Sequence, residues 1–169
     1  IRKLVYNSLV RCHIEYGILA YGGCNNKGIK RIKTLQKRAV RTVANKSRSA
    51  HADPVFGNLE IMKFDDLFQL NSCIFMHKYI NNNLPESFSN MFKPLSEPNR
   101  TKNFLLEKTK HKYLDWFPKV VLPKVWNSFK LELKTAKSAI SIKRQFKTDK
   151  FYEYNSFRCL NTSCYSCGH

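Results

Sequence analysis

The stretch "IKTLQKRAVRTV", from Ile32 to Val43, spaces its apolar and cationic side chains with the period of an α-helix. On a wheel of about 100° per residue, the apolar side chains of this region fall in one sector roughly 140° wide. They are Ile29, Ile32, Leu35, Ala39, Val40 and Val43. The cations lie opposite, at Lys27, Lys30, Arg31, Lys33, Lys37, Arg38 and Arg41. The pattern predicts a helix over about Lys27 to Val43, with one face in a core and one cationic face.

The cationic face has no acidic residue near it in the sequence. No Asp or Glu occurs between Glu15 and Asp53, so the helix lacks the i, i+4 partners that usually neutralise such a face. Like charges at this spacing, such as Lys33 and Lys37, cost roughly a few tenths of a kcal/mol per pair. A solvated face is the ordinary explanation of a Lys-rich helix, but the absence of acids favours nearby phosphates. We therefore predict nucleic-acid contacts from Lys30, Arg31, Lys33, Lys37, Arg38 and Arg41.

The charge of the whole chain agrees with a polyanionic partner. Its 169 residues include 30 Lys and Arg against 12 Asp and Glu, which gives a formal net charge of +18. Nucleic acid is the leading partner for such a chain, and an anionic membrane surface is the alternative. The membrane is disfavoured because the apolar face of the basic helix lacks Trp and Phe and is needed by the core. No run of about 18 apolar residues occurs, so no membrane-spanning helix is predicted.

The remaining patterns predict a mostly α-helical fold, and no two-residue alternation indicates strands. Further helices are expected over Ile1 to Tyr16, over about Asp66 to Ile80 with Asp65 as N-cap, around Pro118 to Phe129 with Pro123 in the first turn, and up to about Tyr154 with Ser138 or Ser141 as cap. The stretch from Ser47 to Pro54 is expected to be a loop. The chain then divides into a helical region over 1–84, a loop-rich connection over 85–112, a second helical cluster over 113–154 and a Cys-rich tail over 155–169.

The tail "CLNTSCYSCGH" contains a set of residues that can bind zinc. Three thiolates and one imidazole suit tetrahedral Zn²⁺, and the two-residue separation between Cys164 and Cys167 is typical of a zinc knuckle. The candidate ligands are Cys159, Cys164, Cys167 and His169. An unstructured Cys-rich tail is the alternative, because Cys167 and His169 are unusually close for two ligands of one metal.

No pattern of residues indicates catalysis. The sequence has no Gly-rich phosphate loop, no G-x-S-x-G elbow and no H-E-x-x-H, and a helix start accounts for Asp65 and Asp66. The stretch "KHKYLDWFPK" mixes aromatic and cationic side chains, which can stack bases while holding phosphates. Core packing explains these aromatic side chains at least as well.

Five short stretches occur in an order that resembles a known family. They are "LVYNSLVRCHIEYGILAYG", "LQKRAVRTV", "HADPVFGNLEIMKFDDLFQLNSCIFMHKY", "LPESF" and "VWNSF". From Leu4 to about Phe146, the chain resembles the region that follows the polymerase palm in reverse transcriptases of jockey-like non-LTR retrotransposons. The resemblance implies an RNA-directed DNA polymerase as the parent protein, and a helical thumb that grips an RNA/DNA template–primer duplex.

The resemblance also implies roles for individual residues and shows which part of the family's polymerase is missing. It places Lys37, Arg38 and Arg41 in a family motif, and it suggests Arg100 through "PNRTKN", although the order Arg100-Thr101 departs from the family's Thr-Arg segment. The palm with its aromatic-x-Asp-Asp motif, which holds the catalytic Mg²⁺, is not present. This chain is therefore expected to bind nucleic acid without polymerising it, with an upstream palm as a partner.

Two alternatives differ in class from a nucleic-acid-binding thumb. One is a transposon-derived remnant, and the other is an interaction module that a C-terminal zinc stabilises. Six Cys without a secretory signal indicate an intracellular protein of the nucleus or cytoplasm.

Overall fold

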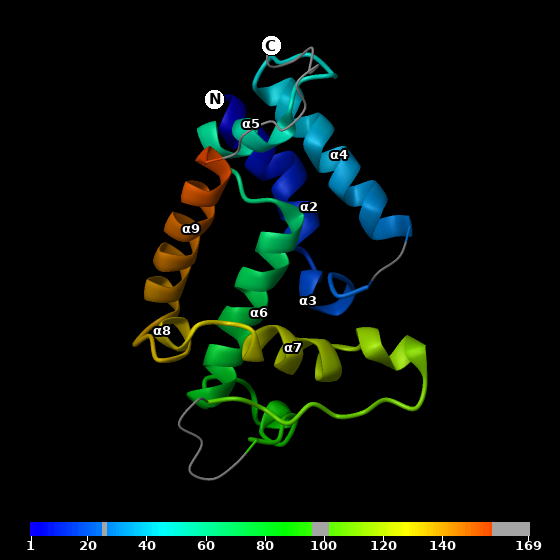
Figure 1. Cartoon of the computed structure of the whole chain (residues 1–169), viewed down its shortest axis with the longest axis vertical. Coiled ribbons are helices and arrows are strands. Elements are labelled where there is room, and N and C mark those ends of the chain that lie inside the picture. Colours follow the sequence, from blue (N-terminus) through cyan, green and yellow to red (C-terminus); the bar gives the residue numbers. More distant parts are fainter. Residues whose placement is uncertain (25–26, 96–101, 157–169) are drawn as a thin grey trace. The chain divides into compact units, whose positions relative to one another are not determined.

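A computed structural model describes residues 1–24, 27–95 and 102–156 of the chain, and these residues are mostly helical (Figure 1). The α-helices are α1 (Arg2–Tyr6), α2 (Cys12–Glu15), α3 (Ile18–Tyr21), α4 (Lys27–Val43), α5 (Ala52–Asn58), α6 (Phe64–Ile80), α7 (Pro118–Asn127), α8 (Leu131–Lys134) and α9 (Ala139–Asn155). A π-helical stretch, Asn7–Arg11, joins α1 to α2, and 3₁₀ turns cover Glu86–Phe88 and Lys112–Trp116. The described residues contain no β-strand and a single bridge between Pro94 and Phe104. The predicted mostly α fold is confirmed.

The chain forms two compact units, and neither is continuous in sequence. The described residues of the first unit are 1–16, 27–66 and 147–156, and those of the second unit are 17–24, 67–95 and 102–146. Two of the boundaries between the units fall inside α6 and α9. The compact units therefore do not coincide with the consecutive parts that were predicted from the sequence, because helices far apart in the chain share one core.

The core of the first unit joins the N-terminal helix, α4, α5 and the end of α9. Its buried side chains are Tyr6, Val40, Ala52, Val55, Phe56, Ile61 and Tyr154. Helix α4 packs against both α1 and α5, which are drawn beside it in Figure 1. The prediction of a loop through Pro54 was wrong from Ala52 onward. Pro54 is the third residue of α5, where a helix needs no intrahelical N–H donor, so proline is tolerated there.

The second unit contains α7, the larger part of α6 and the first half of α9. Trp126, Leu122, Met76 and Ile142 are each at most 1% exposed. Pro123 was predicted to lie in the first turn of α7, and this prediction was wrong. Helix α7 begins at Pro118, so Pro118 occupies the first turn. Pro123 lies inside the helix.

The start of α9 and the end of α6 both follow the usual rules of helix capping. The hydroxyl of Ser138 accepts the backbone N–H of Ser141 at 3.1 Å, which confirms Ser138 as the N-cap of α9. Helix α6 ends where Asn82 adopts a left-handed conformation (φ 53°) and the N–H of Asn83 donates to the carbonyl of Lys78 at 2.8 Å. No helix among the described residues is long and apolar enough to cross a membrane.

Candidate nucleic-acid interface

Helix α4 carries all six predicted nucleic-acid contacts, and its bounds, Lys27–Val43, match the prediction. The helix ends where Asn45 adopts a left-handed conformation (φ 55°), which Asn tolerates better than most residues. The N–H of Lys46 then donates to the carbonyl of Arg41 at 2.9 Å, so one of the last carbonyls of the helix is satisfied. The C-terminal end of the cationic face is therefore well defined.

The buried face of α4 is centred on a polar residue that the sequence analysis did not single out. Gln36 is 2% exposed and lies between the buried Ile29 and Val40. Its Nε2 donates to the hydroxyl of Tyr6 at 2.9 Å and to the carbonyl of Met62 at 3.0 Å. Its Oε1 accepts the N–H of Phe64 at 2.9 Å. Three fixed partners set the rotation of α4 about its axis, and thereby decide which cations face outward.

The same contact corrects the predicted start of α6. The helix begins at Phe64, and its first N–H is satisfied by Gln36 from another helix. Asp65 therefore lies in the first turn and is not the N-cap. Its carboxylate is 2.7 Å from Nζ of Lys33, which also lies 5.8 Å from the centre of the Phe64 ring.

Lys33 and Arg41 consequently differ from the other predicted contacts. Lys33 lacks an acidic partner on its own helix, but Asp65 provides one from a distant part of the sequence. Arg41 is half-buried, and its Nε donates to the carbonyl of Ala50 at 2.6 Å. This contact attaches the following loop to α4 and leaves Arg41 less available to an external ligand.

Four of the predicted cations remain exposed along α4: Lys30, Arg31, Lys37 and Arg38. We call these four residues the basic row. No carboxylate among the described residues pairs with any of them. They form two adjacent pairs that are seven residues apart, which places all four in a sector of about 120° on one side of the helix, over about 12 Å. The basic row is therefore an unneutralised strip of positive charge.

Four acids of the first unit pair with cations outside α4. Glu15 pairs with Arg11 at 2.8 Å, Glu60 with Lys3 at 3.1 Å, Asp53 with Lys63, and Asp66 with Lys150 at 3.2 Å. Apart from Asp65, these carboxylates neutralise cations that lie outside α4. These ion pairs therefore leave the positive charge of the basic row unneutralised.

A buried polar cluster stabilises the core behind the row. Asp66 is 7% exposed, accepts a hydrogen bond from the Tyr154 hydroxyl and pairs with Lys150. Burial, and then this hydrogen bond, raise the pKa of Tyr154, so its hydroxyl keeps its proton and remains a donor. Burial alone would lower the pKa of Lys150, but its contacts with Glu153 and Asp66 raise it. Each polar side chain of this cluster has a hydrogen-bond or ion-pair partner within the protein, so we assign the cluster a structural role.

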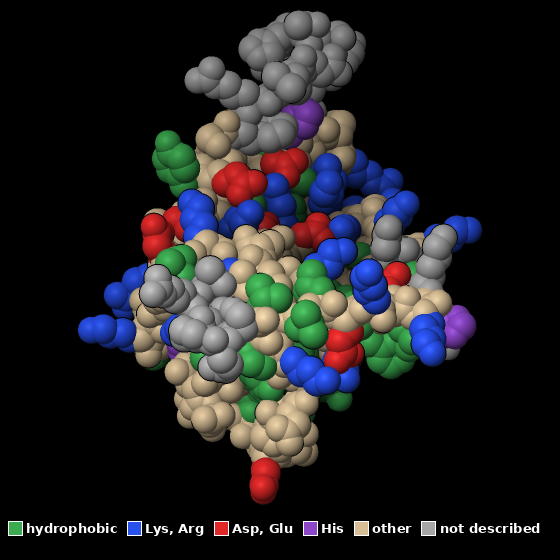
Figure 2. Space-filling view, turned by 60° about the horizontal axis from the view of Figure 1, so that its bottom comes forward, with side chains coloured by type: hydrophobic (Ala, Val, Ile, Leu, Met, Phe, Trp, Pro, Cys, Tyr) green, Lys and Arg blue, Asp and Glu red, His purple; other side chains and the backbone are tan. Residues whose placement is uncertain are grey.

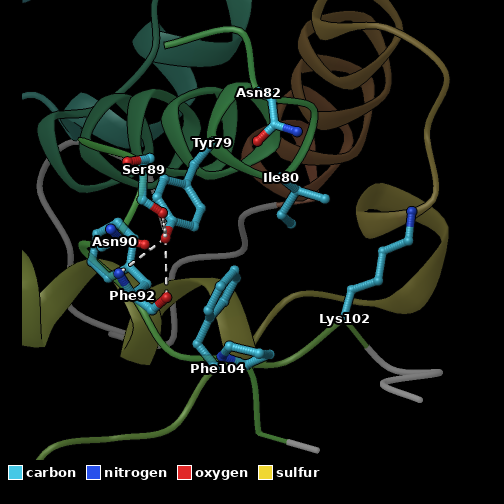
Figure 3. A pocket seen from close by; sticks show the side chains of 9 residues that line it. Tyr79, Ile80, Asn82, Ser89, Asn90, Phe92, Lys102 and Phe104 are labelled. Carbon is cyan, nitrogen blue, oxygen red and sulfur yellow. Dashed lines mark hydrogen bonds between the residues drawn. The ribbon is translucent and has the colours of Figure 1, made fainter. Parts of the chain in front are cut away.

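The second unit contains a pocket of about 510 Å³ beside the end of α6 (Figure 3). Its Tyr79 hydroxyl is engaged with the backbone, donating to the carbonyls of Ser89 (2.9 Å) and Phe92 (3.0 Å) and accepting the N–H of Phe92 (3.1 Å). The rings of Phe92 and Phe104 pack edge-on, 5.9 Å apart, and are each 6% exposed. Among the described lining residues only Lys102 is charged. The pocket therefore has no pair of groups suited to acid–base catalysis.

The predicted zinc ligands Cys159, Cys164, Cys167 and His169, and the suggested contact Arg100, lie outside the described residues. Within the described ranges, no three His, Cys, Asp or Glu side chains come close enough to hold a metal ion. No family model, curated protein or solved structure matches the chain.

Proposed function

We propose that α4 binds the phosphate backbone of an RNA/DNA template–primer duplex, as a non-catalytic, thumb-like part of a retrotransposon reverse transcriptase. The observation that carries this proposal is the basic row, whose four cations have no carboxylate partner among the described residues. Glu15, Asp53, Glu60 and Asp66 of the same unit pair with other cations, so the charge of the row is left for an external polyanion.

The dimensions of the row suit a nucleic-acid backbone. A helix rises about 1.5 Å per residue, so the charges from Lys30 to Arg38 extend over about 12 Å. Each strand of a duplex carries one phosphate per roughly 3.4 Å of its axis, so the row can face three or four phosphates of one strand. Phosphate contacts carry no sequence information, and binding is therefore expected to depend on duplex shape and charge.

Gln36 supports this role from inside the unit. Because its amide is held by three groups, α4 cannot rotate without breaking buried hydrogen bonds. The basic row is thus held outward before a ligand arrives, which lowers the ordering cost of binding.

Polymerisation belongs, in this proposal, to an upstream palm that supplies the Mg²⁺-binding carboxylates. The assignment to reverse transcriptases rests on the five sequence stretches and their order, and such a protein would act in the nucleus or cytoplasm. The zinc-binding tail is part of the same proposal and is tested separately below.

The affinity of the chain for an RNA/DNA hybrid tests the proposal. The double variant Lys37→Gln, Arg38→Gln is expected to bind a fluorescent hybrid at least about tenfold more weakly in an anisotropy titration. Lys3→Gln is the matched control, since it removes an equal kind of charge that is already paired with Glu60. Equal affinities of the double variant and the control would reject α4 as the binding surface.

A further inference from the structure

Two large aromatic side chains of the second unit are exposed. Trp116, the last residue of the 3₁₀ turn Lys112–Trp116, is 40% exposed, and Phe117 beside it is 54% exposed. The other described Phe, Tyr and Trp rings of this unit are buried or partly buried, and Trp126 is 0% exposed. Core packing therefore does not account for the Phe117 ring or for the accessible part of Trp116.

An open groove of about 490 Å³ is lined by residues 106–109 together with Asp115, Val120 and Lys124. Trp116 and Phe117 follow Asp115 directly in the sequence. Its two acids are already engaged: Glu107 is 3.3 Å from Lys119, and Asp115 accepts a hydrogen bond from Thr109. Three exposed lysines, Lys108, Lys110 and Lys124, have no carboxylate partner in the described ranges. Figure 2 shows exposed hydrophobic side chains between Lys and Arg side chains on the face in view.

We propose that this surface, which we call the aromatic groove, binds single-stranded nucleic acid. Bases stack on Trp116 and Phe117, while Lys108, Lys110 and Lys124 hold the phosphates. In a duplex the base faces are covered by neighbouring bases, so exposed rings add affinity only for a strand whose bases are unstacked. The aromatic groove differs in this respect from the basic row of α4, and its assignment does not depend on the proposed function of that row.

A lipid bilayer is the other polyanion that such a surface could meet. The groove lining includes the carboxylates of Glu107 and Asp115, which an anionic bilayer would repel. A single strand can avoid this repulsion, because it can place uncharged bases rather than phosphates beside the two carboxylates, whereas the charge of an anionic bilayer is continuous. The charges of the lining therefore favour a nucleic acid over a membrane.

Tryptophan fluorescence of the full chain provides a direct test. The sequence contains two Trp, and only Trp116 is exposed, so a base that stacks on it should quench the emission while Trp126 is unaffected. The probe is an oligothymidylate of about 16 nucleotides, which covers one typical binding site. We expect quenching in the natural chain and none in Trp116→Phe, although this variant keeps a ring and should bind with nearly unchanged affinity.

Affinities of variants complete the test. Trp116→Ala is expected to weaken binding of the oligothymidylate about fivefold to a hundredfold, and to leave binding of an RNA/DNA duplex unchanged. Lys37→Gln with Arg38→Gln should weaken duplex binding and leave the quenching in place, so failure of either proposal is distinguishable. Leu131→Ala, which removes a side chain 52% exposed in the same unit, is the control.

Three outcomes would overturn the proposal. They are an absence of quenching in the natural chain, an equal loss of strand and duplex affinity in Trp116→Ala, and binding of anionic phosphatidylserine vesicles that depends on Trp116 while strand binding does not.

Discussion

The side-chain carbonyl of Gln36 accepts the backbone N–H of Phe64 at 2.9 Å, so a residue in the middle of α4 satisfies the first N–H group of α6. The two helices are linked through a buried amide that also contacts Tyr6 and Met62. One side chain thus fixes both the start of α6 and the orientation of the basic row.

Replacing Gln36 by Leu is expected to lower the free energy of unfolding by about 2–4 kcal/mol. The change leaves the N–H of Phe64 and the carbonyl of Met62 without their buried partner, and each such group costs about 1–3 kcal/mol. Urea unfolding followed by circular dichroism measures the effect. Leu35→Ala is the control: Leu35 is 51% exposed and should cost less than about 1 kcal/mol. A Gln36→Leu variant as stable as this control would contradict the assigned role.

Replacing Asp65 by Asn is expected to strengthen duplex binding roughly two- to fivefold. Asp65 holds Lys33 at 2.7 Å, and its loss adds Lys33 to the cations available to phosphates. The pair is exposed on both sides, so the free energy of unfolding should change by less than about 1 kcal/mol. Anisotropy titration with an RNA/DNA hybrid checks the effect, and Glu60→Asn, which releases Lys3 away from α4, is the matched control. Weaker binding of Asp65→Asn would count against this account of the helix.

Alkaline pH is expected to destabilise the fold through its buried acids. Burial raises the pKa of the Cys73 thiol from 9.0 to about 12, and it also raises the pKa of Tyr154 and Tyr6. Between pH 9.0 and about 12, the Cys73 thiol loses its proton in the unfolded chain but keeps it in the folded chain. The free energy of unfolding therefore falls as the pH rises through this range. Urea unfolding over this pH range measures the slope, and Cys73→Ala should make it shallower. An unchanged slope in that variant would show that Cys73 does not contribute.

The proposed zinc site predicts one Zn²⁺ per chain in the purified protein. Thiolate ligands bind zinc tightly, so the metal should remain after extensive dialysis and be lost in Cys164→Ser. Metal analysis by plasma mass spectrometry measures the ratio, and Cys12→Ser, which removes an exposed thiol outside the tail, is the control. Zinc-free natural protein would contradict both the knuckle and the zinc-stabilised module.

The sequence predicts those parts of the structure that depend on local periodicity. Lys27–Val43 forms a helix as predicted because its apolar residues repeat over nearly five turns, and Ser138 caps α9 because capping acts over three residues. Helix α5 has seven residues and a proline in its first turn, so it shows no repeat to detect.

The burial of Gln36 had a visible signal, whereas the pairing of Lys33 did not. With Ile29 at zero, Gln36 falls at about 340° on the wheel, inside the apolar sector, where a polar residue indicates a buried hydrogen-bonding role. Lys33 falls at about 40°, next to the buried face, but its partner Asp65 lies far along the chain. Only the packing of α6 against α4 brings the two together, and that depends on the tertiary fold.

The salt dependence of RNA/DNA hybrid binding tests the central claim most directly. If all four cations of the basic row contact phosphates, a plot of log affinity against log salt concentration should have a slope of about −3.6 or steeper. The variant with Gln at Lys30, Arg31, Lys37 and Arg38 should lose about 3.6 units of that slope while its thermal unfolding is unchanged. A slope that is the same in the natural chain and in this variant would contradict the claim that α4 binds the phosphate backbone.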